Sequence, residues 1–116
     1  NYTIKMGCTI ENQITNWVGG LSTVFGPQNY NVALGSNNFQ LTNPYVWNGV
    51  SNLIVEICYE NISNGTNYTN NWSTPYTITP FNSSLSFKSD ATNACPSSQA
   101  PTISNNRPVT KFKTCN

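Results

Sequence analysis

The chain of 116 residues has the usual size of one domain, and only 8% of its residues are charged, with a net charge of +1. Nucleic-acid binders and polybasic membrane anchors both need clustered Lys and Arg, so this composition argues against both classes. No apolar run approaches the roughly 20 residues of a membrane span. We therefore expect a single domain over residues 1–116, with no nucleic-acid partner and no membrane insertion.

Asn, Ser and Thr together supply 46 of the 116 residues, a composition typical of secreted β-proteins. The four cysteines are even in number and contain no CxxC pair: Cys8, Cys58, Cys95 and Cys115. Because the chain has no His, a zinc site would need all four thiolates at unsuitable spacings. Disulfides formed in an oxidising compartment are favoured instead, with three possible connectivities.

Period-two alternation of apolar and polar residues predicts β-strands along the chain, and helical periodicity is absent. Residues 2–10 alternate in this way, whereas residues 53–60 carry apolar side chains on both faces, which predicts a central strand. Shorter strand-like runs follow at residues 37–43, 75–79, 84–89, 101–104 and 108–114. About eight short strands separated by Gly, Pro and Asn predict an all-β fold, a single antiparallel, jelly-roll-like β-sandwich.

Residues 47–52 predict a tight turn before the strand at 53–60. Asn48 and Gly49 both tolerate positive φ, and the side chains of Ser51 and Asn52 can hydrogen-bond the turn backbone. Trp47 is expected to be a large apolar plug in front of the turn. We interpret this motif as structural and not as a binding site.

The stretch "PYVWNGVSNLIVEICYEN" at residues 44–61 resembles the "PFxWDGTSNxxVExCxxN" core of a β-sandwich module of large secreted and cell-surface Bacteroidota proteins. Such proteins are adhesin-like and often carry a type IX secretion sorting domain. The resemblance extends over nearly the whole chain, through "YTIKM", "LSTVFGPQNY", "SFKSDATNAC" and "NNRP". Asn48 stands where the family usually has Asp, which removes a carboxylate from the turn, and Val109 stands where it usually has Asn.

The resemblance implies a disulfide between Cys58 and Cys95. Cys8 would then pair with Cys115, which suits a sandwich whose first and last strands lie side by side. Closing loops of these lengths would contribute about 3–5 kcal/mol each by the chain-entropy model. Bonds from Cys8 and Cys115 to other subunits or neighbouring modules are the alternative.

Catalytic chemistry has little support in the sequence. Without His, Ser–His and Cys–His pairs are impossible, and the carboxylates are Glu11, Glu56, Glu60 and Asp90. Glu56 and Glu60 lie roughly 13 Å apart along one predicted strand, beyond the roughly 9.5 Å limit of glycosidase pairs. A distant pair such as Glu11 with Asp90 remains open. We expect no enzyme and no cofactor, with calcium conceivable only through Asp90 and loop carbonyls.

The polar stretch at residues 61–73 carries the residues that favour carbohydrate recognition. Tyr68 and Trp72 lie there without an obvious core to join, and Trp17 before Gly19-Gly20 is a further candidate for exposure. Sugars stack on such rings, although Trp72 could instead fold back over the sandwich edge. The same stretch holds four N-x-S/T triplets that could accept glycans, at Asn61, Asn64, Asn67 and Asn71.

These observations predict a non-catalytic, extracellular, cell-surface-associated structural or adhesion module. It would be a building block of an adhesin, a filament or a multidomain secreted protein. Its partners would be neighbouring modules or identical subunits, with residues 1–10 or 107–115 completing a neighbour's sheet edge. The alternative is a carbohydrate-binding, lectin-like module that contacts surface glycans through the 61–73 loop.

Overall fold

The computed structural model describes residues 1–60, 62–63, 66–67, 73–89, 95 and 98–115. This part of the chain contains strands and no helix, so the all-β prediction is confirmed, and no segment of it is a helix able to cross a membrane. All strand pairs are antiparallel. The nine strands are β1 (Tyr2–Thr9), β2 (Ser22–Gln28), β3 (Asn52–Cys58), β4 (Ile62–Ser63), β5 (Thr66–Asn67), β6 (Tyr76–Ile78), β7 (Ser84–Ser86), β8 (Thr102–Ser104) and β9 (Asn106–Pro108).

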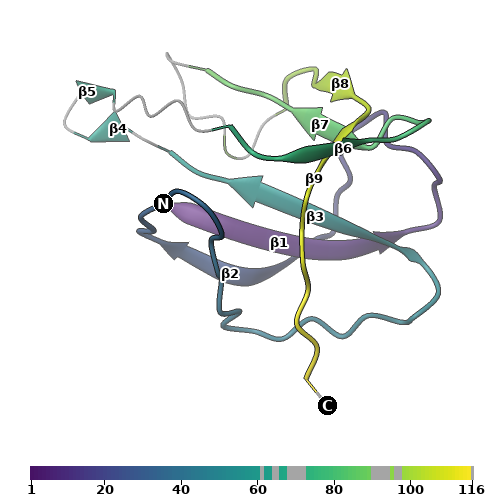
Figure 1. Ribbon diagram of the computed structural model, residues 1–116, viewed down its shortest axis with the longest axis horizontal. Helices are drawn as coiled ribbons and strands as arrows, with labels where there is room; N and C mark the ends of the chain where they lie inside the picture. Colours follow the sequence, from purple (N-terminus) through teal and green to yellow (C-terminus); the bar gives the residue numbers. More distant parts are fainter. Residues whose placement is uncertain (61, 64–65, 68–72, 90–94, 96–97, 116) are drawn as a thin grey trace.

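The largest sheet has three strands in the order β2-β1-β3 (Figure 1). The β1–β3 register is regular from Thr3 opposite Cys58 to Thr9 opposite Asn52. β1 is therefore the central strand, and the prediction that residues 53–60 form a central strand is wrong. Ile54 and Cys58 point to the second face of β3 and are partly buried there, which accounts for the apolar residues without a second neighbouring strand.

The hydrophobic core lies on one face of this sheet. Its buried members are Ile4 and Met6 of β1 and Val24 and Phe25 of β2. The segment between β2 and β3 contributes aromatic and aliphatic side chains that pack against them: Tyr30, Phe39, Leu41 and Tyr45. The resulting core is small, and it is concentrated on the β1–β2 half of the sheet.

Residues 37–43 were predicted to form a strand, and this prediction is wrong. The backbone amides of Thr42 and Asn43 both donate to the carbonyl of Val24, at 2.8 and 3.2 Å, without forming a ladder. Phe39 meanwhile contributes its ring to the core, with its centroid 5.4 Å from that of Phe25. The alternation in this segment therefore reflects packing over the sheet edge of β2 and not pairing within the sheet.

A β-bulge shapes the β1–β2 pair, where the register shifts between Tyr2 and Ile4. Gly26 has a φ of 73°, and an added Cβ would collide with the carbonyl oxygen of Tyr2. Only glycine adopts this backbone conformation readily and leaves room for so close an approach. The bulge accompanies the burial of two consecutive residues, Val24 and Phe25.

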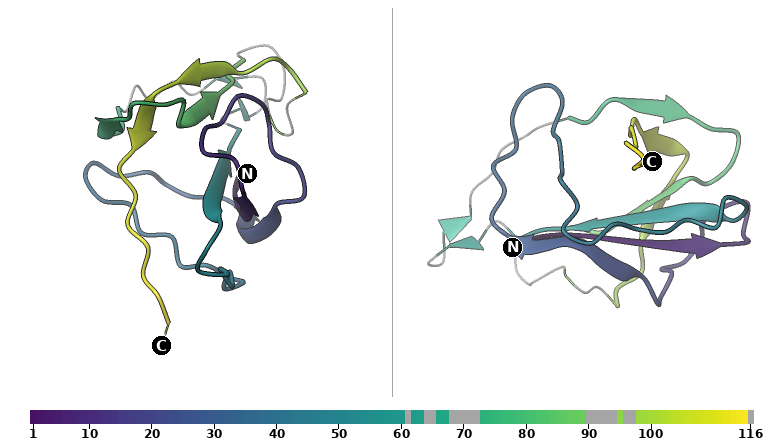
Figure 2. Two further views of the ribbon diagram at one scale, coloured as in Figure 1. Left: turned by 90° about the vertical axis from the view of Figure 1, so that its right-hand side faces the viewer. Right: turned by 90° about the horizontal axis from the view of Figure 1, so that it is seen from below.

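The remaining strands form two-stranded sheets, β6–β9, β7–β8 and β4–β5. The first two lie beyond the β3 side of the large sheet (Figures 1 and 2). Buried Thr79 connects them: its amide donates to the carbonyl of Asn105 at 2.9 Å, and its Oγ1 lies 2.7 Å from the carbonyl oxygen of Phe81. The runs predicted at 75–79, 84–89 and 101–104 contain β6, β7 and β8 respectively.

The end of the chain departs from the prediction. β9 pairs with β6, so the first and last strands do not lie side by side. The predicted strand at 108–114 is also wrong, because the chain leaves β9 at Pro108 and continues without strand pairing. Residues 109–115, which we call the C-terminal segment, cross in front of the three-stranded sheet and run across its strands (Figure 1).

Candidate interaction surface

The 47–52 motif forms a compact hydrogen-bonded turn. The Oδ1 of Asn48 accepts from the amides of Val50 and Ser51, both at 2.9 Å, and its Nδ2 donates to Ser51 Oγ at 2.8 Å. Gly49 adopts a φ of 75°. Asn52 reaches outside the turn and donates to the carbonyl of Glu11 at 2.8 Å. The polar side chains of this motif are thus occupied in holding the turn and in fixing the loop after β1.

Trp47 is not the buried plug that the sequence suggested. Its side chain is 52% exposed, and its Nε1 donates to the carbonyl of Ser51 at 2.8 Å. The ring therefore lies over its own turn. Trp17, the other tryptophan that the structure describes, is 36% exposed and donates to the carbonyl of Gln99 at 2.7 Å.

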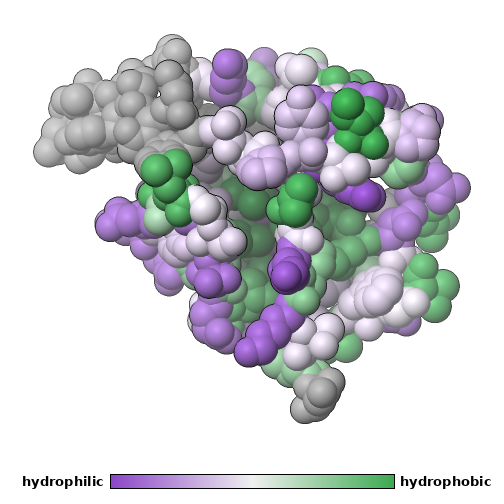
Figure 3. All heavy atoms as spheres, viewed as in Figure 1, coloured by the Kyte–Doolittle hydropathy of each residue, from purple (hydrophilic) through white to green (hydrophobic). Residues whose placement is uncertain are grey.

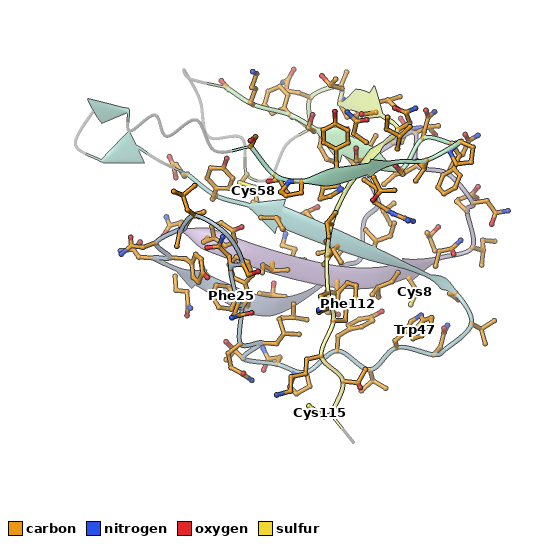
Figure 4. All side chains as sticks on the ribbon, viewed as in Figure 1. Cys8, Phe25, Trp47, Cys58, Phe112 and Cys115 are labelled. Carbon is orange, nitrogen blue, oxygen red and sulfur yellow. A yellow bond between two sulfur atoms is a disulfide. The ribbon has the colours of Figure 1, made fainter. Side chains whose placement is uncertain are left out.

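The cysteines form one disulfide among them and not two. Cys58 and Cys95 are bonded, with their Cα atoms 5.8 Å apart, as the resemblance implied. Cys8 and Cys115 are free, which corrects the predicted second disulfide. The Cys8 thiol lies 3.2 Å from the hydroxyl of Tyr45, and this hydrogen bond is the main cause that raises the pKa of Tyr45. Cys115 lies well away from Cys8, at the far end of the C-terminal segment (Figure 4).

Several predicted site residues lie outside the described part of the chain, and the glycan and calcium predictions therefore stay predictions. These residues are Tyr68, Trp72, Asn61, Asn64, Asn71 and Asp90. Asn67 lies in β5, opposite Ile62. Within the described residues, no three His, Cys, Asp or Glu side chains gather in a group that could hold a metal ion. Glu56 forms an ion pair with Lys5, at 3.5 Å.

An apolar strip follows β3 on the same face as the core. Val55, Ile57 and Tyr59, which we call the β3 strip, are 38%, 50% and 57% exposed. Val55 and Ile57 stand opposite Met6 and Ile4, which are only 5% exposed. Cover by the 29–51 segment therefore buries the β1–β2 half of the face, whereas on β3 only Leu53 packs against the core and the β3 strip stays partly exposed. Figure 3 shows hydrophobic atoms on the floor of a hollow in this side of the molecule.

The outer edge of β3 is unpaired over its length in the described structure. β1 is the one described strand that pairs with it, on its other side. In contrast, the free edge of β2 is covered by the amides of Thr42 and Asn43. The disulfide at Cys58 brings Cys95 to the end of β3, so the open stretch runs from Asn52 to Ile57. No described strand uses the backbone donors and acceptors that point out from this edge, and groups of this kind can pair with an added strand.

The C-terminal segment also exposes apolar side chains, and it carries positive charge. Val109 is 64% and Phe112 is 52% exposed, and Lys111 and Lys113 flank Phe112 in the sequence. At its start, the amide of Val109 donates to the carbonyl of Pro75 at 2.9 Å. Lys111, Phe112 and Lys113 alternate as they would in a strand, with Val109 on the face opposite Phe112, and the segment belongs to none of the described sheets.

The sequence did not reveal that β3 is an edge strand. Its apolar residues on both faces indicated two covered faces, and no sequence signal marks which of its two edges has a neighbour.

The chain matches no known protein family, no curated protein and no solved structure. The surface formed by the β3 strip and its open edge is therefore the feature on which a function can be argued.

Proposed function

We propose that this chain is a non-catalytic, extracellular structural or adhesion module that is joined to neighbours in an adhesin, a filament or a multidomain surface protein. The observation that carries the proposal is the open edge of β3 beside the exposed β3 strip. Natural proteins protect edges of this kind with charges, proline, bulges or covering loops, because an open apolar edge recruits another strand. An edge left open beside exposed Val55 and Ile57 fits a surface used for assembly.

The architecture that we propose for the assembled module is an antiparallel, jelly-roll-like β-sandwich. The three-stranded sheet would form one layer, and the β6–β9 and β7–β8 sheets would contribute to the other. In support, these small sheets lie on one side of the large sheet and present exposed apolar residues of their own, including Tyr76 and Ile78 of β6. Filling the β3 side of the face would enlarge a core that has four buried hydrophobic residues in the described part of the chain.

An extracellular site of action is supported by chemistry that suits an oxidising compartment. The Cys58–Cys95 disulfide persists there and not in a reducing cytosol. The low charge content and the many amides and hydroxyls support the same location. The resemblance of residues 44–61 to β-sandwich modules of cell-surface proteins agrees with the proposed role.

Self-association of the oxidised protein tests the proposal. Sedimentation velocity over a wide range of concentrations should show reversible association, and a glycan array probed with the same preparation should show no retention above background. A monomer at every concentration that binds a glycan, and loses it on Trp72→Ala, would replace the proposal with the lectin-like alternative. The comparison separates the two functions because Trp72 and the β3 strip lie in different parts of the sequence.

A further inference from the structure

We propose that the C-terminal segment of a second copy of this chain adds along the open edge of β3 as a fourth strand of the three-stranded sheet. This inference rests on the proposed structural role and names the partner and the contact. The inference combines two features of the structure. The outer edge of β3 pairs with no described strand and lies beside the exposed β3 strip, and the C-terminal segment belongs to no described sheet. Strand addition of this kind gains affinity from backbone hydrogen bonds and specificity from alternate side chains.

The alternation of side chains limits the registers in which the C-terminal segment can pair with β3. On β3, Val55 and Ile57 face the open hollow, and Glu56 between them faces the opposite side with Lys5. In the C-terminal segment, Phe112 stands between Lys111 and Lys113. Side chains directly across a ladder share a face, so Phe112 set opposite Val55 or Ile57 packs on the apolar side.

Both of these registers also satisfy the charges. If Phe112 lies opposite Val55 or opposite Ile57, the neighbouring position opposite Glu56 is taken by Lys111 or Lys113. A slip by one residue would place Phe112 opposite Glu56 and both lysines on the apolar face. The two allowed registers therefore match apolar to apolar and cation to carboxylate, and the slipped register matches neither.

The overall charge distribution favours the same contact. Three of the five cationic residues lie at Arg107, Lys111 and Lys113, and two of the four acidic residues lie at Glu56 and Glu60. Opposite charges on a strand and on the edge that receives it raise the rate of encounter and oppose wrong pairings. On the open stretch the carboxylate of Glu56, which also pairs with Lys5 at 3.5 Å, is still 32% exposed and can receive one of the two lysines of the segment.

The fold excludes the other terminal segment as the donor. Residues 2–9 form β1, which is already paired on both sides, so releasing them would remove the central strand of the sheet. The C-terminal segment belongs to no described sheet, so its release would remove no strand from one. In its own molecule its start is fixed by the bond from Val109 to Pro75, and it crosses the strands of the sheet where strand addition requires it to run along them.

The contact is head-to-tail, because one copy gives a segment and the next gives an edge. Such contacts do not use the same patch on both partners, so they produce rings or open filaments and not only dimers. Each copy in a chain of molecules would fill one hollow and offer one segment. This geometry gives the proposed building block a direct means of forming a filament.

Complementation between two variants tests the contact. Ile57→Lys damages the edge and leaves the segment intact, whereas Phe112→Asp damages the segment and leaves the edge intact. Both side chains are half exposed, at 50% and 52%, so both variants should fold. In sedimentation experiments the wild type should form larger assemblies and each variant alone should stay monomeric, whereas an equimolar mixture should form a heterodimer and nothing larger.

Matched controls and the contrary outcomes make the test decisive. Ile10→Lys and Val46→Asp make the same kinds of change at side chains that are 86% and 89% exposed, and both should assemble like the wild type. A monomeric wild type at every concentration overturns the inference. So does association that survives Phe112→Asp, or a mixture that stays monomeric; in these two cases the wild type still assembles, and the proposed structural role stands through another surface.

A synthetic peptide provides a measurement that does not depend on how the variants fold. The peptide RPVTKFKTS, with Ser in place of the last cysteine of residues 107–115, should bind the wild-type monomer in fluorescence anisotropy. Replacing its Phe by Asp should weaken binding by about tenfold or more, since buried aromatic side chains carry much of the affinity of an interface. Equal binding by this peptide and a scrambled version of it overturns the inference.

Discussion

Replacing Cys58 and Cys95 together with alanine should lower the free energy of unfolding by about 4 kcal/mol. The disulfide joins residues 37 positions apart, and the chain-entropy relation for a loop of this length gives that value at 25 °C. The core has four buried hydrophobic residues among those that the structure describes, and this value is a large share of the roughly 5–15 kcal/mol that stabilises typical domains. The double replacement also avoids leaving one unpaired thiol at the end of β3.

Urea denaturation of the monomeric protein, followed by tyrosine and tryptophan fluorescence, provides the assay. Cys115→Ser is the matched control, because Cys115 is free and exposed. The free energy of unfolding of this variant should match that of the wild type within about 0.5 kcal/mol. A loss smaller than about 1 kcal/mol in the double variant would refute the reasoning. It would mean that the loop closed by the disulfide adds little constraint to the unfolded chain.

Three further predictions address the core, the turn and the response to alkali. Phe25→Ala, at a side chain only 4% exposed, should lower the free energy of unfolding in urea by about 3–5 kcal/mol. Leu34→Ala, at an 83% exposed side chain, should lower it by less than about 0.5 kcal/mol. Equal losses in the two variants would contradict the position of the core. Asn48→Ala removes the acceptor of two turn amides and should cost about 1 kcal/mol, and an unchanged midpoint would show that water replaces these bonds fully. Burial is the main cause that raises the pKa of the Tyr2 hydroxyl above its usual 10.0. Because the neutral hydroxyl is favoured in the folded state, its contribution to the free energy of unfolding is complete below about pH 10 and is lost as the pH rises through the folded-state pKa of Tyr2. Tyr2→Phe should flatten this alkaline decline, and an identical decline in that variant would assign it to other groups.

Five of the nine described strands could be predicted from the sequence, whereas β2, which supplies Val24 and Phe25 to the core, was not predicted. β1 and β3 follow from period-two alternation, and Asn48-Gly49 indicates the turn before β3 because both residues tolerate positive φ. These features depend on local backbone geometry and on which face of a strand is apolar. Both properties are present in a single short stretch of sequence.

The neighbours of each strand could not be predicted in the same way. An edge strand and a central strand can carry similar alternating side chains, and the pattern of β3 did not record that only β1 lies beside it among the described strands. The segment at 37–43 alternates like a strand but packs its apolar residues over the core without pairing. Long-range contacts decide these outcomes, and alternation does not record them.

The cysteines illustrate the same division. The partner of Cys58 was implied by a resemblance that spans its sequence context, whereas the pairing of Cys8 with Cys115 assumed that the first and last strands are adjacent. β9 instead pairs with β6, and this topology separates the two thiols. The strand predicted at 108–114 is wrong for the same reason: after the bond from the amide of Val109 to the carbonyl of Pro75, residues 110–115 pair with no described strand.

Hydrogen exchange at low and high protein concentration shows whether the C-terminal segment of one copy adds to β3 of the next. In the monomer, the amides of β3 that point away from β1 should exchange rapidly, and so should those of residues 110–115. On assembly, both groups of amides should become protected together, with little change in β1. Assembly that leaves residues 52–57 and 110–115 unprotected would contradict the claim that one copy's C-terminal segment completes the sheet of the next.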